Sequence, residues 1–119
     1  MAKTCVLLIN LGTPDSPSVK DVRKYLFEFL NDPRVIDINL IGRFFLVNFI
    51  IVPFRAPKSA KIYKELWTKD GSPIMIYGES VKEKLQKELG DDFEVELAMR
   101  YQNPSLDEVC ARMEKKGYE

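Results

Sequence analysis

The sequence contains no histidine. This absence removes the side chain that most often moves protons near neutral pH, and with it the commonest nitrogen ligand for transition metals. A function that needs either of these roles therefore has to obtain the histidine from outside this chain.

Cysteine is scarce, and long apolar runs are absent. Cys5 and Cys110 lie far apart in apolar patterns, which predicts buried core thiols rather than a disulfide framework or a zinc site. No basic segment precedes the first apolar run, and no apolar run reaches about 18 residues. The sequence therefore predicts neither a signal peptide nor a membrane-spanning helix, and we expect a cytoplasmic protein.

Neither sign of charge predominates, because 18 basic side chains balance 18 acidic ones. This balance gives no reason to expect a nucleic-acid partner. A chain of 119 residues is one domain at most, and it is long enough to bury a core without disulfides or metals.

The opening of the chain organises the rest. Five apolar residues, Cys5 to Ile9, predict a strand buried on both faces of a parallel sheet. A turn over residues 10–17 follows, and then a helical pattern. Ligands of open α/β sheets bind beyond the carboxyl ends of the strands, so this turn is the expected floor of a site.

Apolar periodicity, caps and stops predict the remaining elements. They are a helix from Val19 capped by Ser18, an extended run or connector over residues 35–40, a helix over 58–67 opened by Pro57, and a helix over 74–89 capped by Ser72 and stopped by Gly90. A half-buried strand over 93–99, either at a sheet edge or with one face only partly covered, and a helix capped by Ser105 and stopped by Gly117 complete the list.

This alternation predicts an α/β fold with three layers, in which helices flank a parallel sheet. Two or three strands with four helices are few for a complete doubly wound domain. We therefore expect residues 1–119 to form an incomplete, flavodoxin-like half that belongs to a longer protein.

Residues 43–54 form an unusually apolar run in which Asn48 is the one polar interruption. About ten apolar residues are too few to span a bilayer. Two interpretations are open: a helix buried on most sides, or an apolar lip over a large hydrophobic ligand that also touches a membrane surface.

Six blocks of the sequence together resemble the N-terminal half of the ferrochelatase family. They are residues 8–15 (LINLGTPD), 27–37 (FEFLNDPRVID), 55–63 (RAPKSAKIY), 71–74 (GSPI), 98–101 (AMRY) and 103–105 (NPS). Each block alone is a weak signal, but they occur in family order and at family spacing over nearly the whole chain.

The resemblance implies insertion of ferrous iron, as a substrate, into a porphyrin during haem synthesis. Either protoporphyrin or coproporphyrin fits this role. Family members have two chelatase-like α/β halves around a cleft, so the resemblance implies a C-terminal half as partner. It also implies that this N-terminal part binds no cofactor of its own.

The porphyrin contacts that the resemblance assigns are Leu11, Arg55, Tyr63, Ser72, Arg100 and Tyr101. Several relatives carry Tyr or Met in place of Leu11, whose aliphatic side chain offers no metal-ligand atom. The family's metal-handling histidine and its glutamate partner belong to the second half. We therefore assign no catalytic and no metal-binding residue here, and expect the fragment to be inactive.

Alternative interpretations stay open for these residues. Arg55 fits either a solvated surface charge or a partner for a porphyrin propionate, and Arg100 fits either a carboxylate anchor or a partner for nearby carbonyls. Tyr63 fits the core, and Ser72 fits a helix N-cap.

Two other functions also remain. A small homodimeric tetrapyrrole chelatase has a similar length but relies on histidines. A non-enzymatic phosphate or nucleotide binder would use residues 12–16, which hold one glycine and an acidic residue.

Overall fold

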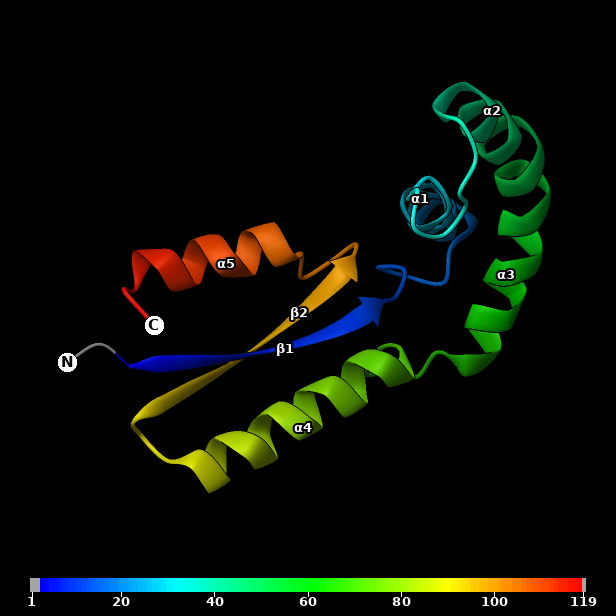
Figure 1. Ribbon diagram of the computed structural model, residues 1–119. Helices are drawn as coiled ribbons and strands as arrows, with labels where there is room; N and C mark the ends of the chain where they lie inside the picture. The colour runs from blue at the N-terminus through cyan, green and yellow to red at the C-terminus, as the bar shows by residue number, and fades with distance from the viewer. Residues whose placement is uncertain (1–2, 119) are drawn as a thin grey trace. The chain divides into compact units, whose positions relative to one another are not determined.

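The computed structural model describes residues 3–118, which form two compact units. The first unit holds the chain up to Thr13 and from Pro73 onward, with β1 (Thr4–Gly12), α4 (Pro73–Leu89), β2 (Phe93–Tyr101) and α5 (Leu106–Lys115). The second unit, residues 14–72, holds α1 (Val19–Leu30), α2 (Leu40–Phe45), the π-helix η1 (Leu46–Ile51) and α3 (Val52–Leu66). Figure 1 labels these helices and strands.

The first unit has three layers. β1 and β2 pair in parallel, with Thr4 opposite Phe93 and Gly12 opposite Tyr101. The helices α4 and α5 lie on opposite sides of this strand pair (Figure 1). The structure thus confirms the predicted α/β class and the parallel sheet flanked by helices.

The burial predicted for the two strands is wrong in both cases. In β2 the residues Val95 to Met99 are all buried, whereas in β1 the side chain of Ile9 is 57% exposed. The reason is that both helices pack mainly on β2. β1 therefore has one strand beside it and little helix above or below it.

The predicted burial of both thiols is also wrong. Cys5 is half-buried on β1, and Cys110 is exposed on α5. Partial burial is the main reason that the pKa of the Cys5 thiol is raised, and the negative charges of Glu96 and Glu94 raise it further.

Local signals set most helix ends in the first unit. Gly90, with φ +78°, ends α4 as predicted, and the Ser105 hydroxyl accepts a hydrogen bond from the Glu108 N–H at the start of α5. Gln86 joins α4 to β2, because its side-chain amide donates to the Phe93 carbonyl (2.9 Å) and its oxygen accepts from the Val95 N–H (2.9 Å).

In the second unit, α1 forms as predicted. The Ser18 hydroxyl accepts a hydrogen bond from the Asp21 N–H, and a buried stripe that includes Val22 and Leu26 follows. α1 packs against α3. No residue of the run 35–40 lies in a strand. The Val35 and Ile36 N–H groups both donate to the Asp32 carbonyl, so residues 35–39 form a turn and connector, and Leu40 begins α2.

The helix predicted over 58–67 begins much earlier. α2, η1 and α3 run on without a break, and Pro57 lies inside α3 rather than in its first turn. Proline removes one hydrogen bond from a helix, and for this reason the sequence predicted that the helix begins at Pro57. Packing against α1 buries Ala56 and Ala60 on either side of Pro57 and keeps the helix intact.

One further expectation for this helix is wrong. Residues 43–54 are not buried on most sides, since Phe49 is 63% and Phe54 73% exposed. The continuous segment Leu40–Leu66 has 27 residues, and by length and composition alone it is sufficient to cross a bilayer. The prediction that the chain has no membrane-spanning helix, made from the shorter run of residues 43–54, stays a prediction.

Gly12 allows the ends of the two strands to approach closely. Its backbone has φ +125°, and a Cβ atom at this position would collide with the Tyr101 carbonyl oxygen. Both the conformation and the contact therefore require glycine where β1 ends.

We predict that Gly12→Ala lowers the free energy of unfolding by about 3 kcal/mol or more, since it adds a backbone collision to an unfavourable φ. Gly71→Ala is the matched control, because Gly71 has φ +115° and no heavy atom within 4 Å of its Cβ position. The control should lose only about 1 to 2 kcal/mol. Urea denaturation followed by circular dichroism measures both, and equal losses would contradict the role given to the collision.

Candidate functional site

The carboxyl end of the sheet holds three of the six predicted site residues. Leu11 lies at the end of β1 and is 47% exposed, and Arg100 and Tyr101 end β2. Gly12 is the register partner of Tyr101, so the parallel pairing brings Leu11 close to both residues of β2. Parallel strands end at the same edge of a sheet, which is where ligands of α/β folds bind.

Arg100 and Tyr101 form a cation–π pair. The guanidinium carbon lies 4.9 Å from the centroid of the Tyr101 ring. The ring is buried, with 4% exposed, whereas Arg100 is exposed. The buried ring therefore holds a cation at the surface, where a guanidinium can bind a carboxylate through two parallel hydrogen bonds.

The loop after β2 turns back on the strand. Gln102 has φ +61°, a left-handed conformation that is uncommon for a residue with a side chain. The Met99 N–H then donates to the Pro104 carbonyl (2.7 Å), across a loop whose Asn103–Pro104 peptide is cis. Nothing in the residue type of Gln102 signals this backbone conformation, so it was not predicted from the sequence.

Two buried hydroxyls have no hydrogen-bond partner among the described residues: Thr13 Oγ1 in the first unit and Ser72 Oγ in the second. The predicted side-chain cap by Ser72 is therefore wrong, because its oxygen accepts no N–H of α4. A buried hydroxyl without a partner is costly, and such groups are candidates for ligand contact. Ser72 was predicted as a site residue from the resemblance, whereas Thr13 was missed.

The second unit places Arg55 and Tyr63 on α3. Arg55 is exposed, and Tyr63 is half-buried between Tyr25 and Trp67, whose ring centroids each lie 6.4 Å away in edge-to-face contact. Burial raises the pKa of Tyr63, while a hydrogen bond with Tyr25 and the charge of Arg55 oppose that increase. The packing interpretation of Tyr63 is supported, and its contact with a porphyrin stays a prediction.

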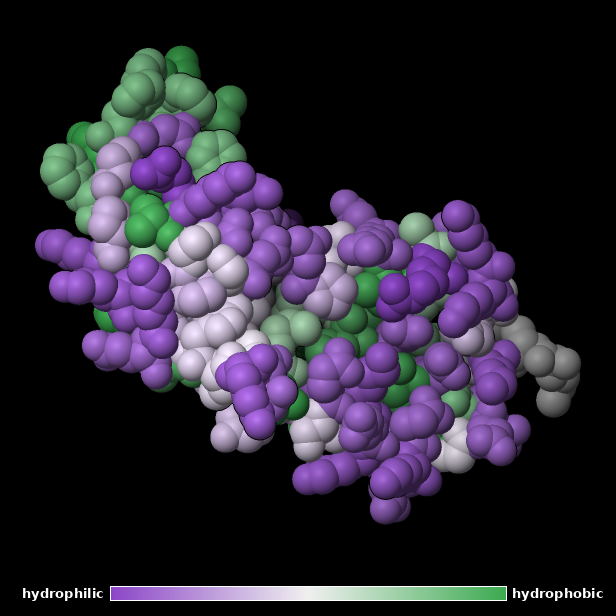
Figure 2. All heavy atoms as spheres, turned by 180° about the vertical axis from the view of Figure 1, so that it is seen from behind, coloured by the Kyte–Doolittle hydropathy of each residue, from purple (hydrophilic) through white to green (hydrophobic). Residues whose placement is uncertain are grey.

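An apolar lip covers the start of the second unit's long helix. It consists of the exposed side chains of Leu40, Ile41, Phe44, Phe45, Phe49, Ile50 and Phe54. Three of its rings contact one another, and the Phe45 and Phe49 centroids lie 5.7 Å apart in a stacked arrangement. Figure 2 shows hydrophobic residues gathered over α2, η1 and the start of α3. An exposed patch of this kind favours contact with an apolar partner.

In the first unit, an aromatic ring lies beside a guanidinium group at the carboxyl end of the sheet. This arrangement suits a flat hydrophobic ligand that carries a carboxylate. Within residues 3–118, no group of three or more histidine, cysteine, aspartate or glutamate side chains lies close enough to hold a metal ion.

Comparison with known proteins identifies the family. The sequence profile of the family described as Ferrochelatase matches residues 3–119. The chain is 48% identical over 113 residues to a ferrochelatase of Coxiella burnetii (strain Dugway 5J108-111), which covers 95% of this chain and 32% of the relative. It is 45% identical over 119 residues to a ferrochelatase of Alcanivorax borkumensis, with 97% of this chain and 35% of the relative covered.

A ferrochelatase of Legionella pneumophila (strain Paris) is 45% identical over 108 residues, with 91% of this chain and 33% of the relative covered. The chain thus spans about a third of the length of the curated relatives it matches. The match to the family profile extends over nearly the whole sequence, and the chain belongs to the ferrochelatase family.

Proposed function

We propose that this chain provides a porphyrin-binding wall of a ferrochelatase, which inserts ferrous iron into the macrocycle. The observation that carries the proposal is the Arg100–Tyr101 pair at the carboxyl end of the sheet, where an exposed guanidinium lies 4.9 Å from a buried aromatic ring. Family membership indicates which reaction to propose. The pair places a positively charged guanidinium, which suits a porphyrin carboxylate, at the sheet edge where ligands of α/β folds bind.

The six site residues would act in different ways. In the first unit, Leu11 offers an exposed aliphatic surface and Arg100 a partner for a porphyrin carboxylate, and in the second unit Arg55 offers a guanidinium of the same kind. Tyr63 and Tyr101 are largely held by packing, so their role is to shape the wall. The buried hydroxyl of Ser72 is a hydrogen-bond group that a ligand can satisfy.

The chemistry of metal insertion also indicates which catalytic groups the rest of the polypeptide has to provide. Two pyrrole N–H protons must leave, and the flat ring must bend so that its nitrogen lone pairs face the metal. Rigid walls can bend a ring, but a base with a pKa near 7 has to accept the protons. This chain has no histidine, so we propose that a histidine and a glutamate from the rest of the ferrochelatase polypeptide do so.

We predict that Arg100→Ala and Arg55→Ala each weaken binding of a carboxylated porphyrin about three- to tenfold, because each removes a charge-assisted pair. Titration of the chain into coproporphyrin, followed by the Soret absorbance, measures the dissociation constants. Arg23→Ala is the matched control, since Arg23 is an exposed arginine on α1 outside the proposed site.

The control should leave the dissociation constant unchanged. Equal weakening by all three substitutions would indicate a general effect of net charge and would contradict the site. Binding that none of the three substitutions alters would also contradict it.

We further predict that the 119-residue chain alone does not metallate porphyrin. Anaerobic incubation with ferrous iron and porphyrin, followed by absorbance, should show no metalloporphyrin above a protein-free control. The physical reason is the missing base. Turnover by the isolated chain that scales with its concentration would overturn this division of roles.

We also propose that the protein is cytoplasmic and touches a membrane peripherally through residues 43–54. The specific observation is the apolar lip, in which Phe49 and Phe54 are more than half exposed. Exposed aromatic rings favour the interface between lipid headgroups and acyl chains. The other side of the long helix is occupied, because α3 packs against α1, and this favours contact along the surface over insertion across the bilayer.

We predict that Phe49→Glu together with Phe54→Glu lowers binding to phosphatidylcholine–phosphatidylglycerol vesicles at least about tenfold, because two anchoring rings are replaced by charges. Co-sedimentation at several lipid concentrations gives the partition coefficients. The control is Tyr77→Glu on α4, which alters an aromatic side chain that is 71% exposed in the other unit. An equal loss in the control, or no binding by the unaltered chain, would refute contact through the lip.

A further inference from the structure

The second unit contains a segment without acidic residues. The chain carries no aspartate or glutamate between Asp37 and Glu65. This segment, residues 38–64, includes the whole apolar lip and five basic residues, which are Arg43, Arg55, Lys58, Lys61 and Lys64. The zero net charge of the chain conceals this asymmetry, because the second unit holds ten basic and seven acidic side chains. The lip therefore lies in a positively charged part of the chain.

Two of these five cations have other roles. Arg43 is buried, and its Nη1 donates a hydrogen bond to the Ile38 carbonyl (3.1 Å). Arg55 is one of the residues assigned to the proposed porphyrin site. The three lysines of α3 are all exposed, and no ion pair joins them to a carboxylate within residues 3–118. Their ammonium groups are thus available to an anionic partner.

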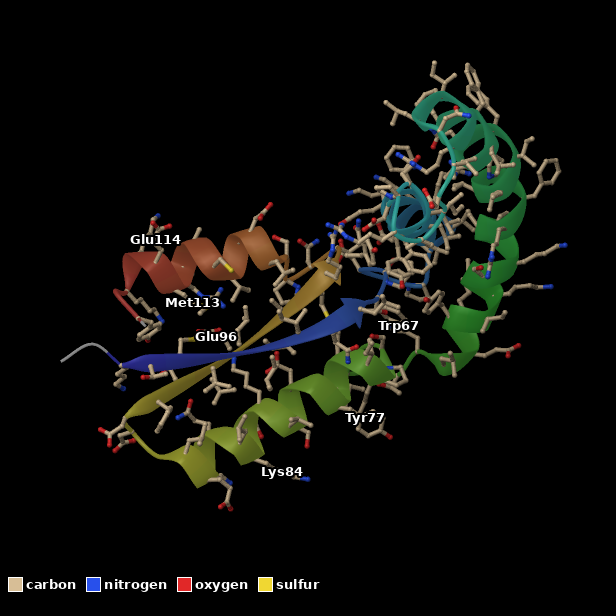
Figure 3. The ribbon with its side chains drawn as sticks, in the orientation of Figure 1. Trp67, Tyr77, Lys84, Glu96, Met113 and Glu114 are labelled. Carbon is tan, nitrogen blue, oxygen red and sulfur yellow. The ribbon has the colours of Figure 1, made fainter. Side chains whose placement is uncertain are left out.

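Lys58 and Lys61 share one face of α3 with Phe54, the last residue of the lip. Residues four and seven positions apart lie on the same face of a helix. Ala56 and Ala60, which the packing on α1 buries, follow Phe54 and Lys58 by two residues each, a rotation of about 200°. The line of Phe54, Lys58 and Lys61 therefore points away from α1. Figure 3 shows long side chains with nitrogen at their tips on this side of α3.

The spacing keeps both lysines within reach of a surface that the lip contacts. Lys58 and Lys61 follow Phe54 by four and seven residues, which corresponds to about 6 and 10 Å along the helix axis. The Debye length at physiological ionic strength is about 8 Å. A helix that lies flat turns this whole face to the surface, and a helix that tilts keeps both ammonium groups within about one Debye length of it. Both orientations therefore allow a charged membrane surface to attract the lysines.

We propose that the second unit binds anionic phospholipids, with the rings of the apolar lip in the membrane interface and Lys58 and Lys61 against the negatively charged headgroups. The inference rests on the peripheral membrane contact proposed above and adds the class of lipid. Amphipathic helices that combine aromatic residues with lysines bind at the boundary between headgroups and acyl chains. Each lysine close to an anionic membrane surface raises the affinity about fivefold.

An acidic surface of another protein is the competing occupant. It would also attract the lysines, and exposed apolar patches occur at protein interfaces as well. The continuity of the surface favours a membrane, because the seven exposed apolar residues of the lip and the two lysines follow one another along a single helical segment. A bilayer offers hydrocarbon and negative charge in this same order, from its interior to its headgroups.

Vesicles of two compositions separate the contribution of the lip from that of the lysines. One kind contains phosphatidylcholine alone, and the other contains equal amounts of phosphatidylcholine and phosphatidylglycerol. Co-sedimentation of the 119-residue chain gives a partition coefficient for each kind. We expect binding to the mixed vesicles to be at least about tenfold stronger at low ionic strength, because two lysines contribute about fivefold each. High salt should remove this difference and leave binding to phosphatidylcholine alone unchanged.

Substitution of the two lysines tests their role directly. Lys58→Gln together with Lys61→Gln should lower binding to the mixed vesicles about tenfold and leave binding to phosphatidylcholine alone unchanged. Lys20→Gln together with Lys24→Gln is the matched control, because it removes the same charge from two exposed lysines of the same unit, four residues apart on α1. The control should lower binding to the mixed vesicles less than about twofold, since these lysines lie on a different helix from the lip.

Three results would overturn the proposal: equal binding of the unaltered chain to both kinds of vesicle, a preference for the mixed vesicles that survives high salt, or equal losses in the two double variants. Equal binding to both kinds of vesicle is the result expected if an acidic protein is the partner of the lysines, and it would refute the lipid class while leaving the lip contact standing. Binding to neither kind would refute the lip contact and this inference together. The salt dependence needs no variant, so the test stands even where a substitution disturbs the fold.

Discussion

The parallel pairing of β1 with β2 is the constraint on which the first unit depends. It joins residues 4–12 to residues 93–101, which are far apart in the sequence. The entropy of closing such a loop rises only with the logarithm of its length, so the long connection through the second unit adds little to the cost. The pairing places Gly12 beside Tyr101, and through this contact it brings Leu11 and Arg100 to one edge of the sheet.

The register of this pairing is fixed by two neighbouring residues of β2. Glu96 is buried and paired with Arg112 of α5, while Leu97 faces α4. A slip of one residue would exchange these faces and put a carboxylate against the apolar side of α4. A buried carboxylate without its partner lowers the stability of the fold far more than replacing both members of the ion pair by apolar residues would. The ion pair therefore selects one register more than it adds net stability.

The parts of the fold that the sequence predicts well are those set by near neighbours. Ser18 and Ser105 cap helices through N–H groups three residues away, and Gly90 ends α4 through its own backbone, so local spacing is sufficient. The predictions for Pro57 and for the burial of the two strands are wrong because both features depend on residues that are distant in the sequence. Packing against α1 keeps a helix intact around Pro57, and the positions of α4 and α5 decide which strand is covered.

The candidate site also combines features that follow from simple rules with features that the sequence does not reveal. Parallel strands end at the same edge of a sheet, and Leu11, Arg100 and Tyr101, which the resemblance assigned without any reference to an edge, lie at that edge in the structure. The Thr13 hydroxyl, which has no hydrogen-bond partner within residues 3–118, and the left-handed Gln102 were missed, because burial and backbone angles of single residues leave no pattern in the sequence. Ser72 carries a family role in the resemblance, but its unpartnered oxygen could be found only in three dimensions.

The electrostatics of the described residues also bear on what this chain can contribute to metal insertion. The pKa values of three side chains within residues 3–118 are shifted away from neutral pH. Burial raises the pKa of the Tyr63 hydroxyl and of the Cys5 thiol, and the neighbouring Glu96 raises the pKa of Arg112. Groups shifted in this direction hold their protons more firmly at pH 7, so none of these three side chains is suited to accept a pyrrole proton. Under the proposed function, the base that accepts the pyrrole protons, and hence the pH dependence of insertion, therefore belongs to the rest of the polypeptide.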